Sequence, residues 1–204
     1  MATKKLEQPG GAMDLGPAEV TAPALDHLWA ERWPECPPVP TRLRAAYPDR
    51  WIRFRALPDG RRCPDTPAEY AEVLGRHHAV LDGLVTDGSL LVLTADYSET
   101  APPHTDTEDG VYWTSVLLTD ARTGYEIHQV LRARRVDWTP GCLDPLLRPV
   151  VGDLSATVLL ADNGLRWLYH PFAGGMDVIV ATGEERDALA DRHRAWRSSR
   201  ASGL

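Results

Sequence analysis

The sequence predicts an α+β fold in which two principal helices and an N-terminal helical arm pack on a mainly antiparallel sheet of about six strands. Three observations lead to this prediction. The chain has 204 residues, 43% hydrophobic and 25% charged, as in one soluble globular domain. Short strand-type segments follow one another at the spacing of an antiparallel meander. Two Thr-x-x-Glu capping boxes, at Thr66 and Thr182, mark the starts of helices.

The chain divides into three expected regions: a flexible tail over residues 1–20, a helical arm over residues 21–49 and a single α+β domain over residues 50–204. The tail is rich in glycine, proline and other small residues and shows no apolar period, as in segments that do not fold. In the arm, apolar side chains recur along one stripe of residues 22–33, which predicts a short helix. Four prolines in residues 34–40 then end that helix. The arm is therefore expected to lie over the main domain.

In the main domain, residues 51–57 alternate between apolar and polar side chains, which predicts a half-buried strand. The first principal helix is expected to start after Thr66, because Pro67 and Glu69 occupy positions N1 and N3 and apolar residues follow at helical spacing. His77 falls in that apolar stripe, and we expect a core histidine bonded to a backbone carbonyl.

Strand-type patterns fill most of the remaining chain. The strongest turn signal between them is Asp162-Asn163-Gly164, because Asn-Gly accepts positive φ at little cost and so predicts a hairpin. A short helical turn is expected within residues 140–151. The segments that read as strands are residues 90–97, 111–118, 125–136, 156–161, 165–169 and 176–181.

Composition excludes several classes of protein. The chain has 22 basic and 29 acidic residues, a net charge of −7, which argues against a general nucleic-acid binder and a polybasic membrane anchor. Three dispersed cysteines without a C-x-x-C pair fit reduced thiols in a cytosol. No apolar run approaches the ~18 residues of a membrane span, and the N-terminus lacks the apolar stretch of a signal peptide. A cytoplasmic protein is expected, and its arginine-rich, lysine-poor composition suggests a high-GC bacterial coding sequence.

Two segments carry a resemblance. Trp51-Ile-Arg-Phe-Arg-Ala-Leu-Pro58 precedes a helix containing Arg76-His77-His78-Ala79-Val80-Leu81, and Tyr169-His170-Pro171-Phe172-Ala173-Gly174-Gly175-Met176-Asp177-Val178-Ile179 leads into the final helix. This order is similar to an uncharacterised family of small bacterial cytoplasmic proteins in which W-x-R-x-H-S-L-P and H-P-Y-x-G-G-x-D-V recur. The resemblance covers the chain from about residue 50 to the end. Arg55 and Ala56 stand where the first motif has His and Ser. The resemblance implies one soluble domain and no established activity.

His104 and Asp106 form an H-x-D pair in the polar loop between two expected strands. On an extended segment residues i and i+2 point to one side, so the two side chains could chelate one metal ion. With His170 as a distant third ligand, or His128 in its place, they would form the two-histidine, one-carboxylate face that binds Fe(II). The pattern resembles 2-oxoglutarate-dependent oxygenases, although those have a double-stranded β-helix and an arginine soon after the distal histidine, which residues 171–185 lack. The alternative is a solvated acidic loop.

The segment from His170 to Asp177 is the most distinctive in the chain. Gly174 and Gly175 allow positive φ and close approach of the backbone, so a tight turn or a ligand in contact with the main chain is expected. His170 and Asp177 could form a hydrogen-bonded acid–base pair across that turn. The alternative is a structural hairpin in which Asp177 accepts turn amides and His170 packs on a neighbouring aromatic residue. A functional role here would favour partner contact over catalysis.

Arg53 and Arg55 on the first strand and Arg132 and Arg134 on a later strand share i, i+2 spacing. If the two strands are neighbours, the four guanidinium groups form a positive stripe with Trp51 on the same face. Arginine forks bind carboxylates and phosphates, so the stripe would receive an acidic protein surface or a nucleotide. The alternative is cross-strand ion pairing with some of the 29 acidic residues.

Seven tryptophans are many for this length, and most are expected in the core. Trp29 and Trp33 are the exception, because two aromatic side chains on a mobile arm make a binding anchor. The alternative is that they attach the arm to its own domain. The sequence contains neither a phosphate-binding glycine loop nor a G-x-S-x-G motif, so no nucleophile or nucleotide cofactor is indicated.

These observations favour a non-enzymatic, cytosolic bacterial protein that binds a protein partner, of the immunity or antitoxin type, without a cofactor. The net charge of −7 suits a basic partner such as a nuclease, through electrostatic steering. There are two alternatives. One is a small Fe(II) enzyme built on His104, Asp106 and His170, and the other is a small-ligand binding module built on the arginines.

Overall fold

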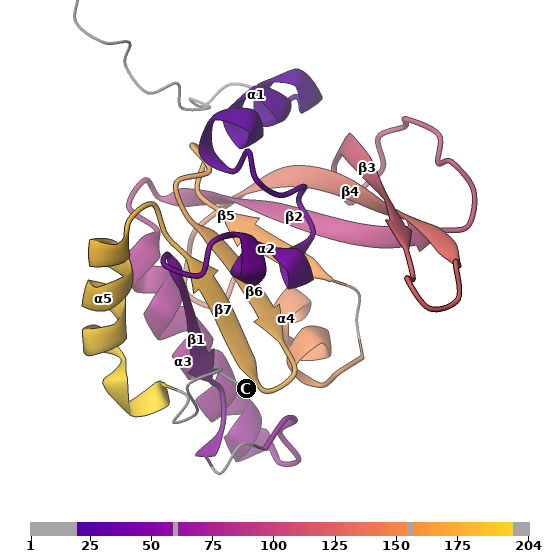
Figure 1. Ribbon diagram of the computed structural model, residues 1–204. Coiled ribbons are helices and arrows are strands. Elements are labelled where there is room, and N and C mark those ends of the chain that lie inside the picture. The colour runs from indigo at the N-terminus through magenta and orange to yellow at the C-terminus, as the bar shows by residue number, and fades with distance from the viewer. Residues whose placement is uncertain (1–19, 59–60, 155–156, 198–204) are drawn as a thin grey trace, which may run out of the picture.

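An antiparallel sheet is the centre of the structure, a computed structural model that describes residues 20–58, 61–154 and 157–197 (Figure 1). The spatial order of its strands is β1-β7-β6-β5-β2-β4-β3, and every neighbouring pair is antiparallel. The strands are β1 (Trp51–Arg55), β2 (Ser89–Ser98), β3 (Val111–Thr119), β4 (Glu126–Asp137), β5 (Val158–Ala161), β6 (Leu168–Phe172) and β7 (Gly175–Ile179).

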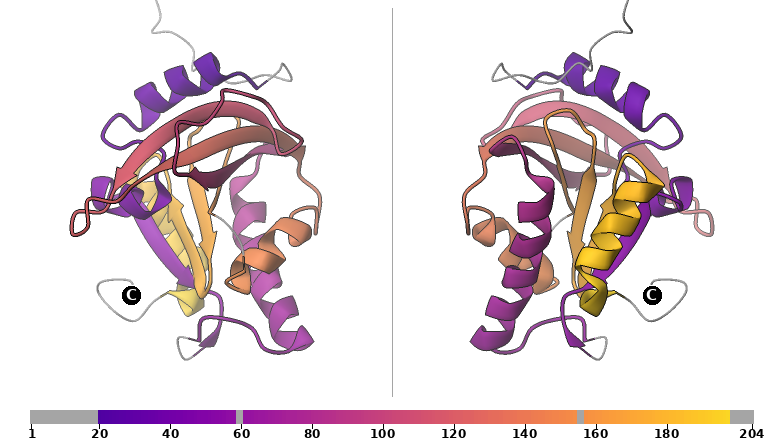
Figure 2. Two further views of the ribbon diagram at one scale, coloured as in Figure 1. Left: turned by 90° about the vertical axis from the view of Figure 1, so that its right-hand side faces the viewer. Right: turned by 90° about the vertical axis from the view of Figure 1, so that its left-hand side faces the viewer.

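Helices cover both faces of this sheet, so that the described part of the chain has three layers. Figure 2 shows the first helix above the curved sheet and the long third helix below it. No helix within the described ranges combines the length and apolar character needed to cross a membrane. The helices are α1 (Ala22–Arg32) and α2 (Pro40–Ala46) on one face, and α3 (Pro67–Leu84), α4 (Asp144–Val151) and α5 (Gly183–Arg192) on the other.

The central position of β2 in the sheet explains why its sequence is apolar without interruption. Leu91 and Leu93 pack in the core beneath α1 and α2, whereas Leu90 and Val92 pack in the core beneath α3 and α4. Successive side chains of a strand point to opposite faces, and a strand covered on both faces therefore needs apolar residues at every position.

The caps of the two principal helices follow the sequence closely. Thr66 accepts the N–H of Glu69, and the Glu69 carboxylate accepts the N–H of Thr66, which completes the predicted capping box of α3. At α5 the Thr182 hydroxyl accepts the N–H of Glu185 at 3.2 Å. The Glu185 carboxylate, however, accepts the N–H of Ala181, one residue before the expected donor.

The α+β class and the antiparallel sheet are confirmed, and the counts differ in detail. In the described ranges the sheet has seven strands, where about six were expected, and there are five α-helices. The short helix α4 lies where a helical turn was expected within residues 140–151, whereas α2 was not expected and follows the proline-rich segment of the arm. Each begins with a proline in its first turn, where the missing N–H is not needed.

The hairpin expected at Asp162-Asn163-Gly164 is a longer connection in the structure. β6 begins at Leu168, not at residue 165, so residues 162–167 join β5 to β6. The left-handed backbone conformation falls on Leu165, whose φ is 49°. The Asp162 carboxylate accepts the N–H of Arg166, which stabilises the wider turn.

His77 is fully buried in the core, as predicted, but its partner is a side chain. Its Nδ1 lies 2.6 Å from the hydroxyl of Tyr169 on β6, where a backbone carbonyl was expected. The Tyr169 hydroxyl also contacts the sulfur of Met176, at 3.2 Å. Burial lowers the pKa of His77 to about 3.

Candidate acidic interaction surface

The end of β2, the second half of β3 and the start of β4 project beyond the helical layers. This part, residues 96–128, is called the acidic extension below, and Figure 1 shows it reaching away from the helices. It contains seven acidic residues and one arginine, a net charge of −6. The rest of the chain contains 22 acidic and 21 basic residues, a net charge of −1. Almost all of the net charge of the protein is therefore concentrated in one projecting element.

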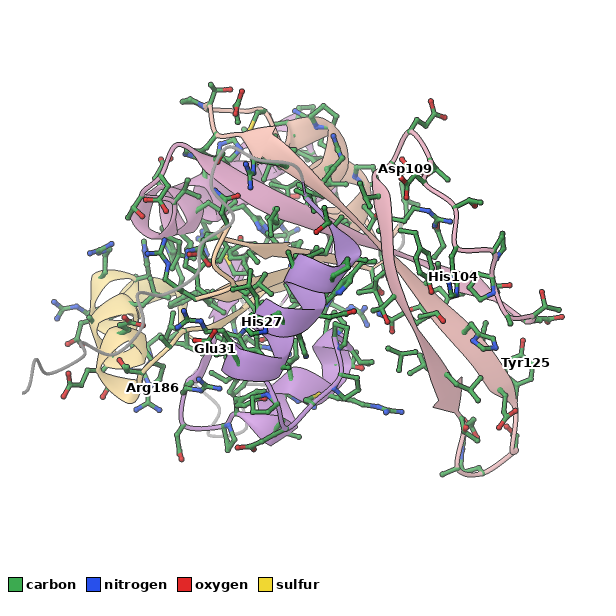
Figure 3. The ribbon with its side chains drawn as sticks, turned by 90° about the horizontal axis from the view of Figure 1, so that it is seen from above. His27, Glu31, His104, Asp109, Tyr125 and Arg186 are labelled. Atoms are coloured by element: carbon green, nitrogen blue, oxygen red, sulfur yellow. The ribbon has the colours of Figure 1, made fainter. Side chains whose placement is uncertain are left out.

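Three of the four large apolar residues that are exposed in the described ranges also lie on the acidic extension. They are Tyr97 (49% exposed), Leu117 (47%) and Tyr125 (50%). In Figure 3 the labelled residues Asp109 and Tyr125 lie on the projecting side of the molecule, away from α1. The Tyr125 hydroxyl donates to Glu99 at 2.9 Å, and this hydrogen bond raises the pKa of Tyr125. The exposed ring is thus held in one place beside a carboxylate.

β3 is the last strand of the sheet in the described part of the chain, so one of its edges has no neighbouring strand there. α1 packs on its first half, where Trp113 donates to the Asp26 carboxylate at 2.9 Å. Its second half, Ser115–Thr119, is partly or fully exposed and contains a Val-Leu-Leu run. An apolar edge strand is a template for pairing with another chain unless charge protects it. Here acidic residues flank the strand at both ends.

A cavity of about 390 Å³ opens between α1, the segment after it and β3. It is called the tryptophan pocket below. The rings of Trp29 and Trp113 lie 5.4 Å apart in its wall, and those of Trp29 and Trp33 lie 6.4 Å apart. The indole N–H of Trp29 donates to the carbonyl of Cys36 at 2.8 Å. Asp26 and Glu35 are the carboxylates of this pocket, and both residues are exposed. Aromatic walls with acidic groups beside them suit a cationic side chain.

Trp29 and Trp33 therefore do not project as the free anchor that the arm suggested. They are 7% and 1% exposed, and they pack on the sheet with Leu91 and Leu93. Their apolar area attaches α1 to its own domain. Trp51 lies beside Arg53, as expected, with the guanidinium carbon 5.5 Å from its ring centroid, and it packs partly buried against the same core.

Arg53, Asp177 and His170 lie side by side on the neighbouring strands β1, β7 and β6. Arg53 donates from Nε and Nη2 to the two oxygens of Asp177, each at 2.7 Å. The carboxylate expected to accept turn amides or to pair with His170 is therefore held by a guanidinium group. Burial lowers the pKa of His170 to about 4, against the opposing effect of Asp177. α2 covers this row through Leu43, without space for a water molecule beneath it.

The two glycines of the β6–β7 hairpin have a packing role. Gly174 has φ of 103°, which supplies the tight turn. A Cβ on Gly175 would lie 2.1 Å from the carbonyl oxygen of Phe54, because β7 approaches β1 closely there. The close approach that the sequence predicts is thus made by the neighbouring strand.

The four arginines of the expected stripe are not brought together. β1 is at one edge of the sheet and β4 is separated from it by four strands. Arg53 faces α2 in its pair with Asp177. Arg132 lies opposite Thr94, on the face of α3 and α4, and pairs with Asp96 at 2.8 Å. Arg134 lies opposite Val92 on that second face, and Arg55 lies at the end of β1.

His104 and Asp106 lie together in the segment between β2 and β3, and the structure does not bring His170 to them. His104 stacks on Tyr112 with ring centroids 4.5 Å apart, and Asp106 accepts the N–H of Tyr112 at 2.9 Å, whereas His170 is on β6. His128, the second candidate, lies on β4 opposite Leu117. No group of three or more His, Cys, Asp or Glu side chains within residues 20–58, 61–154 and 157–197 is placed to hold a metal ion.

The acidic extension is the feature that the sequence analysis missed. The signal was present, because counting charges in a sliding window shows the excess of acid over residues 96–128. The total of −7 conceals it. The projection of β3 and β4 beyond the helices could not be predicted from the sequence, because it depends on which strands α3 and α4 cover.

A family model described as a domain of unknown function (DUF3885) matches residues 39–201. The match covers most of the 204 residues, so the chain belongs to the DUF3885 family. It confirms the expectation that the chain belongs to an uncharacterised family. The match includes α2 and the whole sheet and begins after α1. No curated protein and no solved structure gives a significant match.

Proposed function

We propose that this member of the DUF3885 family is a non-enzymatic binding protein that takes a basic protein partner on its acidic extension, in the manner of an immunity protein or antitoxin. The observation that carries the proposal is the concentration of a net charge of −6 in residues 96–128, against −1 in the rest of the chain. The proposal places the protein in the cytoplasm of a bacterium, where such partners are neutralised.

Charge of one sign on a projecting element acts before contact. It attracts a partner of opposite charge and raises the association rate by ten-fold or more at low salt. The field decays over a Debye length of about 8 Å at physiological salt. A projecting element presents its charges to a partner at that range, while a dispersed charge of the same size would not.

Contact would then involve the exposed apolar side chains. Tyr97 and Tyr125 are held by hydrogen bonds to Thr157 and Glu99. Burying their rings in an interface would therefore cost little additional side-chain conformational freedom. Tyrosine is enriched at the energetic centres of protein interfaces. Leu117 pairs with His128 and therefore points to the other face of the sheet from Tyr97, where it supplies apolar area without a polar group to desolvate.

The tryptophan pocket continues the same surface, because Trp113 and Thr114 of β3 form part of its wall. A lysine or arginine side chain of the partner fits its chemistry, with the charge beside Asp26 and Glu35 and the stem against the indole rings. The proposed interface therefore runs from this pocket along β3 to the β3–β4 turn.

The test is a tagged pull-down from the native host at physiological salt, followed by mass spectrometry. Three baits are compared: the wild type, a fourfold extension variant (Glu99→Gln, Glu108→Gln, Asp109→Asn, Glu126→Gln) and a fourfold control (Asp49→Asn, Asp65→Asn, Asp187→Asn, Asp191→Asn). All eight residues are exposed, and both variants lose four negative charges.

We expect one stoichiometric basic protein with the wild type and the control, and its loss from the extension variant. Inhibition of that protein's activity by the wild type would then establish neutralisation. Retention of the partner by the extension variant would overturn the assignment of the surface. Wild-type bait that returns alone at both physiological and low salt would overturn the function.

A further inference from the structure

A second cavity, of about 330 Å³, lies on the opposite face of the sheet from the tryptophan pocket. It is formed where the end of α3, the end of the β5–β6 connection and α5 meet, and it is called the α3–α5 cavity below. Its volume is at the lower end of the range of small-molecule sites. The residues that matter for its chemistry are Gly83, Leu84, Trp167, Leu189 and Arg192.

The floor of the α3–α5 cavity is apolar and fixed. The indole N–H of Trp167 donates to the carbonyl of Leu84 at 3.0 Å, which locks the ring across the end of α3. Val180 and Leu189 belong to the core beneath this ring. The floor therefore offers a preformed surface to an aryl or alkyl group and needs no rearrangement.

The charged groups of the cavity differ in what they are free to bind. Arg166 is committed to the carboxylates of Asp162 and Asp87. The Glu185 carboxylate accepts the N–H of Ala181 at 3.0 Å. Arg192, by contrast, makes no hydrogen bond or ion pair with any of the described residues, and its charge helps to lower the pKa of the neighbouring His193. It is the cation in this cavity that is available to an anion.

Gly83 fixes where that cation lies. A Cβ at this position would be 2.6 Å from Nη1 of Arg192, so the guanidinium group lies directly on the backbone of α3. Glycine is one of the poorest helix formers, and α3 is 18 residues long with Gly83 in its last turn. Without a side chain at this position, the guanidinium group of Arg192, an exposed residue, lies against the end of α3 at the mouth of the cavity.

We propose that the α3–α5 cavity binds a small amphipathic carboxylate, with its charged end on Arg192 and its aryl or alkyl body on Trp167 and Leu189. A guanidinium fork pairs with a carboxylate through two parallel hydrogen bonds, and the body buries apolar area on a floor that is already formed. The site is independent of the acidic extension and adds a small-molecule function to the proposed partner binding.

The experiment uses the full chain and two probes, 3-phenylpropanoate and its neutral analogue 3-phenylpropan-1-ol. Binding is followed by calorimetry and by the NMR signal of the Trp167 indole N–H, assigned with Trp167→Phe. We expect the carboxylate to bind at least ten-fold more tightly than the alcohol and to shift the Trp167 signal. Arg192→Met keeps an apolar stem and should reduce carboxylate affinity at least ten-fold, to the level of the alcohol.

Two further variants separate this site from general charge effects. Arg194→Met removes the same charge two residues away and should leave the affinity unchanged. Gly83→Ala should weaken carboxylate binding several-fold while raising the melting temperature, because it displaces the guanidinium group and improves the helix. Equal binding of carboxylate and alcohol, no response of the Trp167 signal at millimolar probe, or an Arg192→Met variant that binds normally would each overturn the proposal.

Discussion

The indole N–H of Trp33 donates to the carbonyl oxygen of Leu165 at 2.8 Å, across 132 residues of sequence. Leu165 is fully buried and has the left-handed φ of 49°, a conformation that a leucine side chain rarely adopts. The hydrogen bond satisfies a carbonyl that would otherwise be buried without a partner. The helical arm thus helps to hold the β5–β6 connection in its unusual conformation.

Trp33→Phe is expected to destabilise the protein by about 2–3 kcal/mol. The variant leaves the Leu165 carbonyl unsatisfied and opens a small cavity, and both effects carry costs of this order. Urea unfolding followed by circular dichroism gives the free energy. Trp138→Phe is the control, because it removes a solvent-exposed hydrogen bond to Asp82 from a partly buried ring, and it should cost less than about 1 kcal/mol. Equal losses in the two variants would contradict this role of the arm.

The Arg53–Asp177 ion pair predicts that the stability losses of the two single variants do not add up in the double variant. The two side chains are 14% and 9% exposed, so a variant of either one leaves a nearly buried charge without a partner. Arg53→Met and Asp177→Asn should each cost about 3 kcal/mol. The double variant should cost well below the sum, because it leaves no uncompensated charge. Chemical denaturation of the four proteins completes the cycle, and a double variant that loses the full sum would show that the pair contributes no coupling.

The buried His77 makes stability depend on pH in a defined window. Its pKa is about 3 in the folded protein and about 6.5 when unfolded, so the unfolded chain binds an extra proton between these values. Stability is therefore unaffected by His77 above pH 6.5 and falls as the pH drops below it, by up to about 1.4 kcal/mol per pH unit.

His77→Phe should lower stability at pH 7, because the Tyr169 hydroxyl loses its hydrogen bond to the His77 ring and keeps only the weaker one to the Met176 sulfur. The difference from the wild type should shrink at pH 5. Thermal unfolding at both pH values measures this. Tyr169→Phe keeps the histidine and removes the same hydrogen bond, and it should show the steep pH dependence of the wild type. A His77→Phe deficit that is constant with pH would exclude proton linkage through this residue.

How far the sequence predicts this fold depends on whether the signal is local. The capping box at Thr66 specifies α3 because every group it needs lies within four residues. The register of β5 and β6 does not follow from Asp162-Asn163-Gly164, because Trp33 from the distant arm and the side chain of Asp162 stabilise a wider connection. Local turn chemistry was outweighed there by contacts that only the folded chain contains.

In the candidate site, too, local features could be predicted from the sequence and contacts between distant residues could not. His170 and Asp177 were recognisable as a distinctive pair, but the partner of Asp177 is Arg53, which lies 124 residues earlier. The four arginines share a spacing and still lie on opposite faces of the sheet, since strand order is not contained in i, i+2 spacing. The acid excess of residues 96–128, by contrast, is a local property and was available from the sequence alone.

The two kinds of residue on the acidic extension should affect partner binding through different rate constants. Charges act at a distance and so set the association rate, whereas buried aromatic contacts are made only in the complex and set the dissociation rate. With the partner identified in the pull-down, the fourfold extension variant should slow association about ten-fold or more and flatten its dependence on salt. Tyr125→Ala should leave association nearly unchanged and raise the dissociation rate about ten-fold or more, the effect of losing one anchor residue.

Tyr112→Ala is not a suitable control because its ring supports His104, so Leu154→Ala, at an exposed apolar residue outside the extension, serves instead. Surface plasmon resonance at several salt concentrations measures both constants. Changes confined to the dissociation rate in the charge variant would mean that the acidic extension acts through short-range contacts and not by steering.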